Sequence, residues 1–173
     1  MHPLGVEGAL LLARALGLIV EDAGFARERF FGSLRSSVSE GALLEKLRLA
    51  EGARGEGIPA LGNGIEALES VPTALACFAT WPDSFTDAVG AAILLGGDTD
   101  TIGAMTGALS GARLGVGAIP RAWLSALEDD PGVPGRSAIR RLADELCALT
   151  SPRAARPAPG GSRRDCRGRS LAR

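Results

Sequence analysis

The chain has 173 residues and a net charge of −1, and 46% of its residues are apolar but only 4% are aromatic. This length suits one domain of ordinary size, whose core must be built from Ala, Leu, Ile and Val. The charge is uneven, because residues 151–173 contain seven Arg and one Asp, a net +6, which leaves −7 for residues 1–150. A basic tail without aromatic residues, beside an acidic body, argues against dedicated nucleic-acid binding.

The ends and the apolar runs predict the compartment. The first residues carry no basic segment ahead of an apolar one, so no secretory signal is expected. No uninterrupted apolar run reaches 18 residues, so no membrane span is expected either. Three cysteines at long spacing match neither a zinc site nor a disulfide framework. We therefore expect a cytoplasmic protein.

The first half of the body reads as a series of helices. Residues 6–20 are apolar at nearly every turn, as in a mostly buried helix, and amphipathic segments follow at 25–34 and 41–50. Residues 54–63 are predicted to form a loop, because Gly and Pro interrupt them. A further helix begins at residue 65, and Pro72 is expected to restart or kink it.

The second half continues in the same way. Asp83 or Ser84 is placed to cap a helix over 85–95, which Gly96-Gly97 ends, and helices over 99–114, 120–127 and 137–149 follow. No segment shows period-two alternation bounded by turns, so the predicted fold is all-α, with one helical domain over residues 1–149. Residues 150–173 hold almost no large apolar side chains and are predicted to be disordered.

Small residues mark one face of the predicted helix over 99–114. Gly103, Gly107, Gly111 and Gly115 recur every four residues. Glycine costs up to ~1 kcal/mol per helix position relative to alanine. We therefore expect this face to lie against another helix at close approach, which would offset the cost.

The densest group of polar residues is Gly96-Gly97-Asp98-Thr99-Asp100-Thr101. Two carboxylates and a hydroxyl around a turn are oxygen ligands suited to Mg²⁺ or Ca²⁺. The alternative is helix capping by Asp98 or Thr99, and the spacing alone leaves both open. If the acids are ligands that lack their partners, like-charge repulsion is expected to raise the pKa of at least one of them.

The same residues begin like the Asp-x-Asp-x-Thr nucleophile motif of haloacid-dehalogenase-like phosphatases. The final Thr of that motif would fall on Ile102, however, and Gly96-Gly97 separates the apolar run from the acids. Those enzymes also need a downstream Lys, whereas the single Lys of this chain, Lys46, lies upstream. We therefore reject the phosphatase interpretation.

Two segments carry a resemblance to a known family. The sequence from Leu95 through the Gly-Gly-Asp-Thr-Asp-Thr turn to Gly115, with the Ile119-Pro120 and Trp123 that follow, resembles the ADP-ribosylglycohydrolases. The Leu-Gly-Asn-Gly-Ile-Glu segment that begins at Leu61 is similar to the branch that includes the serine-ADP-ribose and O-acetyl-ADP-ribose hydrolases. The resemblance, over roughly residues 2–128, implies an all-α, magnesium-dependent hydrolase of ADP-ribosyl bonds in proteins or in O-acetyl-ADP-ribose.

The resemblance also implies roles for particular residues. The family's two-magnesium centre takes part of its ligands from positions that match Asp98, Asp100 and Thr101. The positions that hold the ADP-ribose-containing substrate match His2, Leu47 and Ile65. The catalytic glutamate, the Thr-Asp-Asp-Thr metal motif and the Gly-rich diphosphate loop of the family have no match, so no catalytic residue is assigned in this chain.

These missing motifs lead to an expectation about completeness. The chain resembles a C-terminal half of the family domain, so we expect a truncated form that needs an N-terminal half as its partner and is impaired or inert alone. A half-domain is expected to expose contiguous apolar surface. The alternative is a catalytically inactive helical fragment that acts as an ADP-ribose-binding or interaction module.

Overall fold

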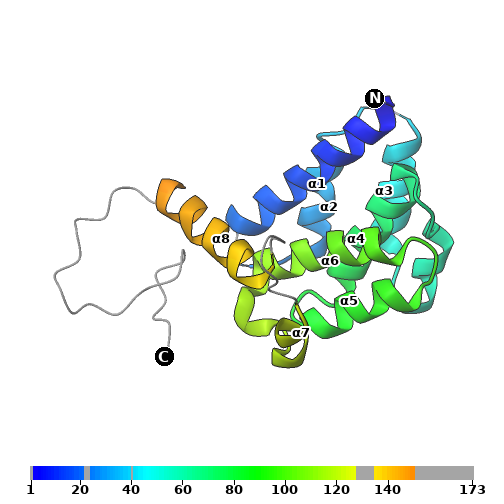
Figure 1. Cartoon of the computed structure of the whole chain (residues 1–173). Helices are drawn as coiled ribbons and strands as arrows, with labels where there is room; N and C mark the ends of the chain where they lie inside the picture. The colour runs from blue at the N-terminus through cyan, green and yellow to red at the C-terminus, as the bar shows by residue number, and fades with distance from the viewer. Residues whose placement is uncertain (1, 22–23, 40, 128–134, 151–173) are drawn as a thin grey trace, which may run out of the picture. The chain divides into compact units, whose positions relative to one another are not determined.

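The computed structural model describes residues 2–21, 24–39, 41–127 and 135–150, which form helices and the turns between them (Figure 1). The chain divides into two compact units, Met1–Pro120 and Arg121–Arg173. The first unit contains α1 (Pro3–Glu21), α2 (Arg27–Arg35), α3 (Ala42–Gly52), the 3₁₀ helix η1 (Gly55–Leu61), α4 (Ala67–Thr80), α5 (Phe85–Leu94), α6 (Thr99–Leu114) and the 3₁₀ helix η2 (Val116–Ala118). The second unit contains α7 (Arg121–Ala126) and α8 (Arg136–Thr150). The described residues form no strand, so the predicted all-α fold is confirmed, and the sheet that a phosphatase would need is absent from them.

Helix α4 is the centre of the first unit. All ten residues from Ser70 to Ala79 are buried, as expected for a helix that is covered on every side. It packs against α1, α3, α5 and α6, and Figure 1 shows these helices around it. Pro72 lies inside α4 without ending it. The predicted restart at Pro72 does not occur, because this burial offsets the backbone hydrogen bond that proline cannot make.

Helices α5 and α6 form a hairpin that holds the candidate site at its turn. Ser84 caps α5, as predicted, by accepting a hydrogen bond from the Asp87 backbone N–H at 3.3 Å. On α6, a Cβ added to Gly103 would lie 3.7 Å from Ile93, and one added to Gly107 would lie 3.8 Å from Val89. The predicted face therefore packs on α5 at these two positions only, at distances that leave room for a methyl group. The predicted close approach is wrong for Gly111 and Gly115, where an added Cβ would meet nothing within 4 Å.

The 3₁₀ helix η1 corrects the predicted loop over residues 54–63. Ile58 and Leu61 are buried, at 2% and 1% exposed, and lie three residues apart. A 3₁₀ helix repeats every three residues, so both side chains fall on one face that contacts the core. Burial of this face, which neither Gly nor Pro in the segment reveals, gives the segment its regular structure.

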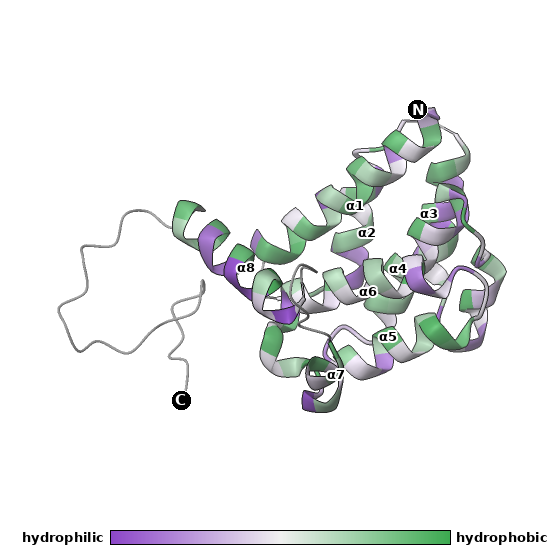
Figure 2. Cartoon of the chain, in the orientation of Figure 1, coloured by the Kyte–Doolittle hydropathy of each residue, from purple (hydrophilic) through white to green (hydrophobic). Residues whose placement is uncertain are grey.

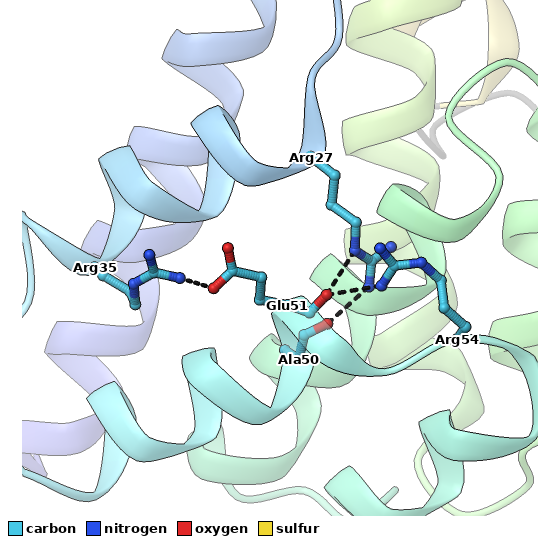
Figure 3. Close-up of polar contacts among 5 residues, drawn as sticks. All are labelled: Arg27, Arg35, Ala50, Glu51 and Arg54. Atoms are coloured by element: carbon cyan, nitrogen blue, oxygen red, sulfur yellow. Dashed lines mark hydrogen bonds and ion pairs between the residues drawn. The ribbon is translucent and has the colours of Figure 1, made fainter.

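The junction of α2 and α3 is held by a buried arginine. Arg27, 7% exposed, donates hydrogen bonds to the carbonyl oxygens of Glu51 at 2.9 Å, Ala50 at 2.8 Å and Ala53 at 2.5 Å, all at the C-terminal end of α3. Figure 3 shows its guanidinium over this end of the helix, with Glu51 also paired to Arg35. Burial, followed by repulsion from Arg54, lowers the pKa of Arg27 to about 10. The guanidinium satisfies carbonyls that the end of the helix leaves without partners.

Helix α1 is apolar around much of its circumference (Figure 2). By length and composition alone it could cross a membrane, a test that core helices of soluble proteins and signal sequences also pass. No membrane span was expected from the sequence, whereas α1 is one candidate by length and composition. Leu11, Ala15 and Ile19 are buried, whereas Leu10 and Val20 are each 65% exposed.

Other large apolar side chains of the first unit are also exposed. This exposure agrees with the expectation for a half-domain. That these side chains form one contiguous apolar patch stays a prediction. Besides Leu10 and Val20, the set comprises Val6, which also lies on α1, and Leu49, Ile65, Ile93, Leu94 and Val116.

In the second unit, α8 carries apolar residues on one stripe. Ile139, Leu142 and Leu146 follow one another at spacings of three and four residues, as in an amphipathic helix. The helix ends at Thr150, one residue beyond the predicted domain limit. The predicted disordered tail otherwise lies outside the described residues.

Candidate functional site

The turn between α5 and α6 brings the two aspartates together. Gly96 and Gly97 have φ angles of 71° and 69°, in the left-handed region that favours glycine. A Cβ on Gly97 would also lie only 2.2 Å from the Asn63 carbonyl oxygen. The Gly-Gly pair is therefore required by backbone conformation, and at Gly97 by space as well.

Asn63 connects this turn to the Gly-Asn-Gly-Ile segment. The backbone N–H of Asp98 donates to the Asn63 carbonyl oxygen at 2.8 Å, and the Asn63 side-chain Nδ2 donates to the Leu95 carbonyl oxygen at 2.9 Å. The two segments that carry the family resemblance thus contact each other directly. Both segments stand out in the sequence, but their contact could not be predicted from it.

Glu69, in the first turn of α4, supports the other side of the same loop. Its Oε2 accepts a hydrogen bond from the Gly64 backbone N–H at 2.8 Å. A Cβ on Gly62 would lie 2.5 Å from the Glu69 Cδ atom, and one on Gly64 would lie 2.7 Å from Oε2. The carboxylate therefore fills the space that side chains at these two positions would need.

The predicted metal ligands lie at the N-terminal end of α6. Asp98 occupies the N-cap position, yet its side chain makes no capping hydrogen bond, and it is partly exposed. Asp100 and Thr101 lie in the first turn and are exposed. Of the two capping candidates that the spacing left open, Asp98 thus makes no side-chain cap and Thr99 is already the first residue of the helix.

The protonation behaviour of Asp100 corrects one expectation. Its pKa lies below its ordinary value, first because of a hydrogen bond with the Asp98 side chain, and second because the backbone N–H groups of Thr101 and of Asp100 itself stabilise the carboxylate. The expectation concerned at least one of the two acids, and the rise does not occur at Asp100, where the hydrogen bond with Asp98 and the two backbone donors outweigh like-charge repulsion. Asp100 is consequently ionised at neutral pH and available as a ligand.

The donor set fits part of a magnesium shell. Mg²⁺ takes about six oxygen ligands, several of them usually water, and Asp98, Asp100 and Thr101 offer two carboxylates and one hydroxyl. The described residues contain no group of three or more His, Cys, Asp or Glu side chains that could hold a metal ion. The three residues can thus bind a cation only together with water, substrate or ligands from elsewhere.

The predicted substrate residues lie in three different places. Ile65 follows the Asn63 loop and is 83% exposed, and His2 is exposed just before α1. Gly8 of α1 packs on Ala67 at the start of α4, where an added Cβ would lie 3.0 Å from the Ala67 Cβ. His2 lies six residues before Gly8, so it is ~9 Å along α1 from the point where this helix contacts the start of α4. Leu47 has no exposed surface, because it belongs to the core face of α3, so its contact with substrate stays a prediction.

A cleft of about 220 Å³ lies elsewhere in the first unit. None of the predicted site residues lines it. Its walls come from the end of α1, the segment before α2, α2 itself and the end of α6, and they include Phe25, Arg29, Ser33 and Arg113. Most of its lining residues fall between Leu18 and Ser33, and Arg113 is the distant one, but no motif in that stretch marks a cleft.

The sequence is similar to those of known proteins. The model of the ADP-ribosylglycohydrolase family matches residues 1–156. ADP-ribosylhydrolase ARH3 of Homo sapiens is 37% identical over 140 residues, which cover 73% of this chain and 35% of that protein. ARH3 of Danio rerio is 42% identical over 103 residues, covering 53% and 27%. The ADP-ribosyl-[dinitrogen reductase] glycohydrolase of Rhodospirillum rubrum is 42% identical over 67 residues, covering 39% and 21%. The matched part of the chain spans about a third or less of these curated relatives.

Proposed function

The chain belongs to the ADP-ribosylglycohydrolase family, and on that premise we propose that it takes part in the magnesium-dependent hydrolysis of ADP-ribosyl bonds. The substrate is an ADP-ribosylated protein or O-acetyl-ADP-ribose. The observation that carries the proposal is the state of the two aspartates: Asp98 makes no capping bond at its N-cap position, and Asp100 is exposed with a lowered pKa. Two acids held side by side at an exposed turn, one of them without a capping bond, favour a ligand role.

The reaction breaks the bond between ribose C1″ and the acceptor oxygen or nitrogen. A water oxygen forms the new bond to C1″, the bonding electron pair leaves with the acceptor, and a proton is transferred to it. Magnesium supplies, when bound, the orientation of the ribose hydroxyls and of the water. In this chain Asp98 and Asp100 would hold the ion through carboxylate oxygens and Thr101 through its hydroxyl, while the exposed Ile65 would offer an apolar contact to the substrate.

The chain is proposed to need a partner for catalysis. We assign no catalytic residue to it, and loss of a general base or acid typically slows a reaction by ~10²–10⁴-fold. The rest of the family fold, an N-terminal half, would supply that group and the remaining ligands. Exposed apolar residues such as Leu10 and Val20 of α1 support a covering partner.

The compartment and the other partners follow from α1 and the charge pattern. We propose a cytoplasmic location without membrane or nucleic-acid partners. Leu11, Ala15 and Ile19 of α1 are buried in the same core as α4 residues, a use that neither a cleaved signal nor a membrane span would have. Cell fractionation checks this proposal, and recovery of the chain in the membrane fraction would contradict it.

The experiment tests whether the chain releases ADP-ribose when an N-terminal half is supplied as a separate polypeptide. The purified chain is mixed with a polypeptide that supplies the N-terminal half of a relative, and ADP-ribose release from O-acetyl-ADP-ribose and from a serine-ADP-ribosylated peptide is followed by chromatography with and without Mg²⁺. Neither polypeptide alone is expected to act, whereas the mixture should act only with Mg²⁺.

Two matched variants assign that activity to the turn. Asp100→Asn should abolish it, because one ligand carboxylate is lost. Asp87→Asn changes an acid in the first turn of α5, outside the site, and should leave activity unchanged. Equal activity of the Asp100→Asn mixture and the unmodified mixture would show that these acids are not ligands.

The second candidate function is a catalytically inactive module that binds ADP-ribose or a protein. The exposed apolar side chains favour it, because they fit a binding surface as well as a half-domain interface. Calorimetry with free ADP-ribose separates the two candidates. Binding by the chain alone, together with no activity in the reconstituted mixture, would favour the module.

A further inference from the structure

The loop that precedes α4 is held by donors from three helices. The Nζ of Lys46 on α3 donates to the Leu61 carbonyl oxygen at 2.5 Å. The Thr73 hydroxyl of α4, fully buried, donates to the Gly62 carbonyl oxygen at 2.7 Å. The next carbonyl, that of Asn63, accepts from the start of α6. Three successive carbonyl groups are therefore fixed from three directions, and the loop is a rigid support.

Asn63 uses this support to hold both ends of the Gly-Gly reversal. Its side-chain Nδ2 bonds the Leu95 carbonyl just before the two glycines, and its own carbonyl bonds the Asp98 N–H just after them. Glycine has more backbone freedom to lose than any other residue. A residue that fixes both ends of a Gly-Gly turn therefore removes freedom that ligand binding would otherwise have to remove.

We propose that Asn63 is a positioning residue for the metal turn, setting the place of Asp98 and thereby the cation affinity of the Asp98–Asp100 pair. This inference rests on the proposed function, because it assumes that the pair binds a cation. Glu69 contributes indirectly to this positioning. Its carboxylate accepts a hydrogen bond from the Gly64 backbone N–H and so supports the loop that carries Asn63.

The mechanism predicts a loss of affinity without loss of fold. Asn63 is partly exposed, and its side chain makes one hydrogen bond, which typically contributes about 1 kcal/mol. Removing it should release the Leu95 end of the turn while the core stays intact. We expect Mg²⁺ to bind about fivefold more weakly, which is that contribution converted to a ratio of affinities.

The test is an NMR titration of the full, uniformly ¹⁵N-labelled chain with Mg²⁺. The affinity is read from the Asp98–Thr101 amide resonances, and hydrogen exchange of the Asp98 amide is measured without metal. The variants are Asn63→Ala, which removes the Nδ2 donor, and Asn63→Asp, which keeps the shape but places a carboxylate oxygen against the Leu95 carbonyl. Asp87→Asn is the control, because it alters an acid at the start of another helix.

The expected result is about fivefold weaker Mg²⁺ binding in both Asn63 variants and about fivefold faster exchange of the Asp98 amide. Exchange of the Ile102 amide, which bonds the Asp98 carbonyl at 3.0 Å, should stay the same as evidence of an intact helix. Asp87→Asn should match the unmodified chain in every measurement.

Two outcomes separate this inference from the proposed function. If the unmodified chain binds Mg²⁺ and both Asn63 variants bind equally well, the positioning role is wrong and the metal site stands. If the unmodified chain binds no Mg²⁺, the proposed site fails, and the exchange data alone decide on Asn63. Unchanged Asp98 exchange in both variants would then overturn the positioning role, whereas about fivefold faster exchange would retain it.

Discussion

Replacing Arg27 by alanine is expected to lower the free energy of unfolding by about 3–5 kcal/mol. The guanidinium donates to three carbonyl groups at the end of α3, lies 3.4 Å from the Thr80 hydroxyl and stacks 5.3 Å from the centre of the Phe31 ring. Hydrogen bonds to charged groups contribute about 1.5–3 kcal/mol each, and the cost of burying the charge, visible in the lowered pKa, offsets part of their sum.

The assay is urea unfolding of the chain, followed by circular dichroism. Arg27→Lys is expected to be intermediate, because one ammonium group cannot reach all three carbonyls in the fork geometry of arginine. Arg48→Ala is the matched control, since Arg48 is exposed and pairs only with Glu45 one helical turn away. Its effect should stay within about 0.5 kcal/mol. An Arg27→Ala variant that unfolds within 1 kcal/mol of this control would refute the reasoning.

Further predictions concern Cys77, Thr106 and Gly107. Burial raises the pKa of the Cys77 thiol to about 12, so in the folded chain at pH 8 the Cys77 peptide should resist N-ethylmaleimide, as read by mass spectrometry. The same shift predicts that stability declines as pH rises from about 9, the ordinary thiol value, towards 12, because only the unfolded chain then releases the proton. Thr106→Val should raise the free energy of unfolding by about 1 kcal/mol, because the buried Thr106 hydroxyl has no hydrogen-bond partner among the described residues, and a lower urea midpoint would contradict this. Gly107→Ala should be neutral or stabilising by up to ~1 kcal/mol, since the new methyl group would lie 3.8 Å from Val89, and a drop in melting temperature would show that the helices cannot accept it.

Local signals in the sequence predicted much of the fold. Helix α6 was predicted over residues 99–114 and occupies Thr99–Leu114, because glycines on both sides end the regular backbone. Ser84 was predicted as a possible cap and is the cap of α5. Each of these features depends on interactions within about one helical turn, so it can be predicted from neighbouring residues in the sequence.

The support of the candidate site was not predicted. Asn63 and Asp98 are 35 residues apart, and only the packing of α4 against α6 brings their backbones to 2.8 Å. From the sequence, Glu69 is an ordinary acid in the first turn of a helix. In the structure it supports the preceding loop and fills the space that side chains at positions 62 and 64 would need. The glycines at 62 and 64 were the available signal, but what fills the space beside them depends on the tertiary structure.

The sequence by itself determined the helical periodicity, the positions of the turns and the chemistry of the Asp-Thr-Asp-Thr segment. Only the tertiary structure decided how those parts are used: that α4 continues through Pro72, that Arg27 closes the end of α3, and that Asp98 is held by Asn63 without capping its own helix. The physical reason is the separation along the chain over which each kind of interaction acts. Helix propensity, capping and turn conformation act between neighbours along the chain, whereas burial, desolvation and the satisfaction of backbone groups depend on which distant segments the core brings together.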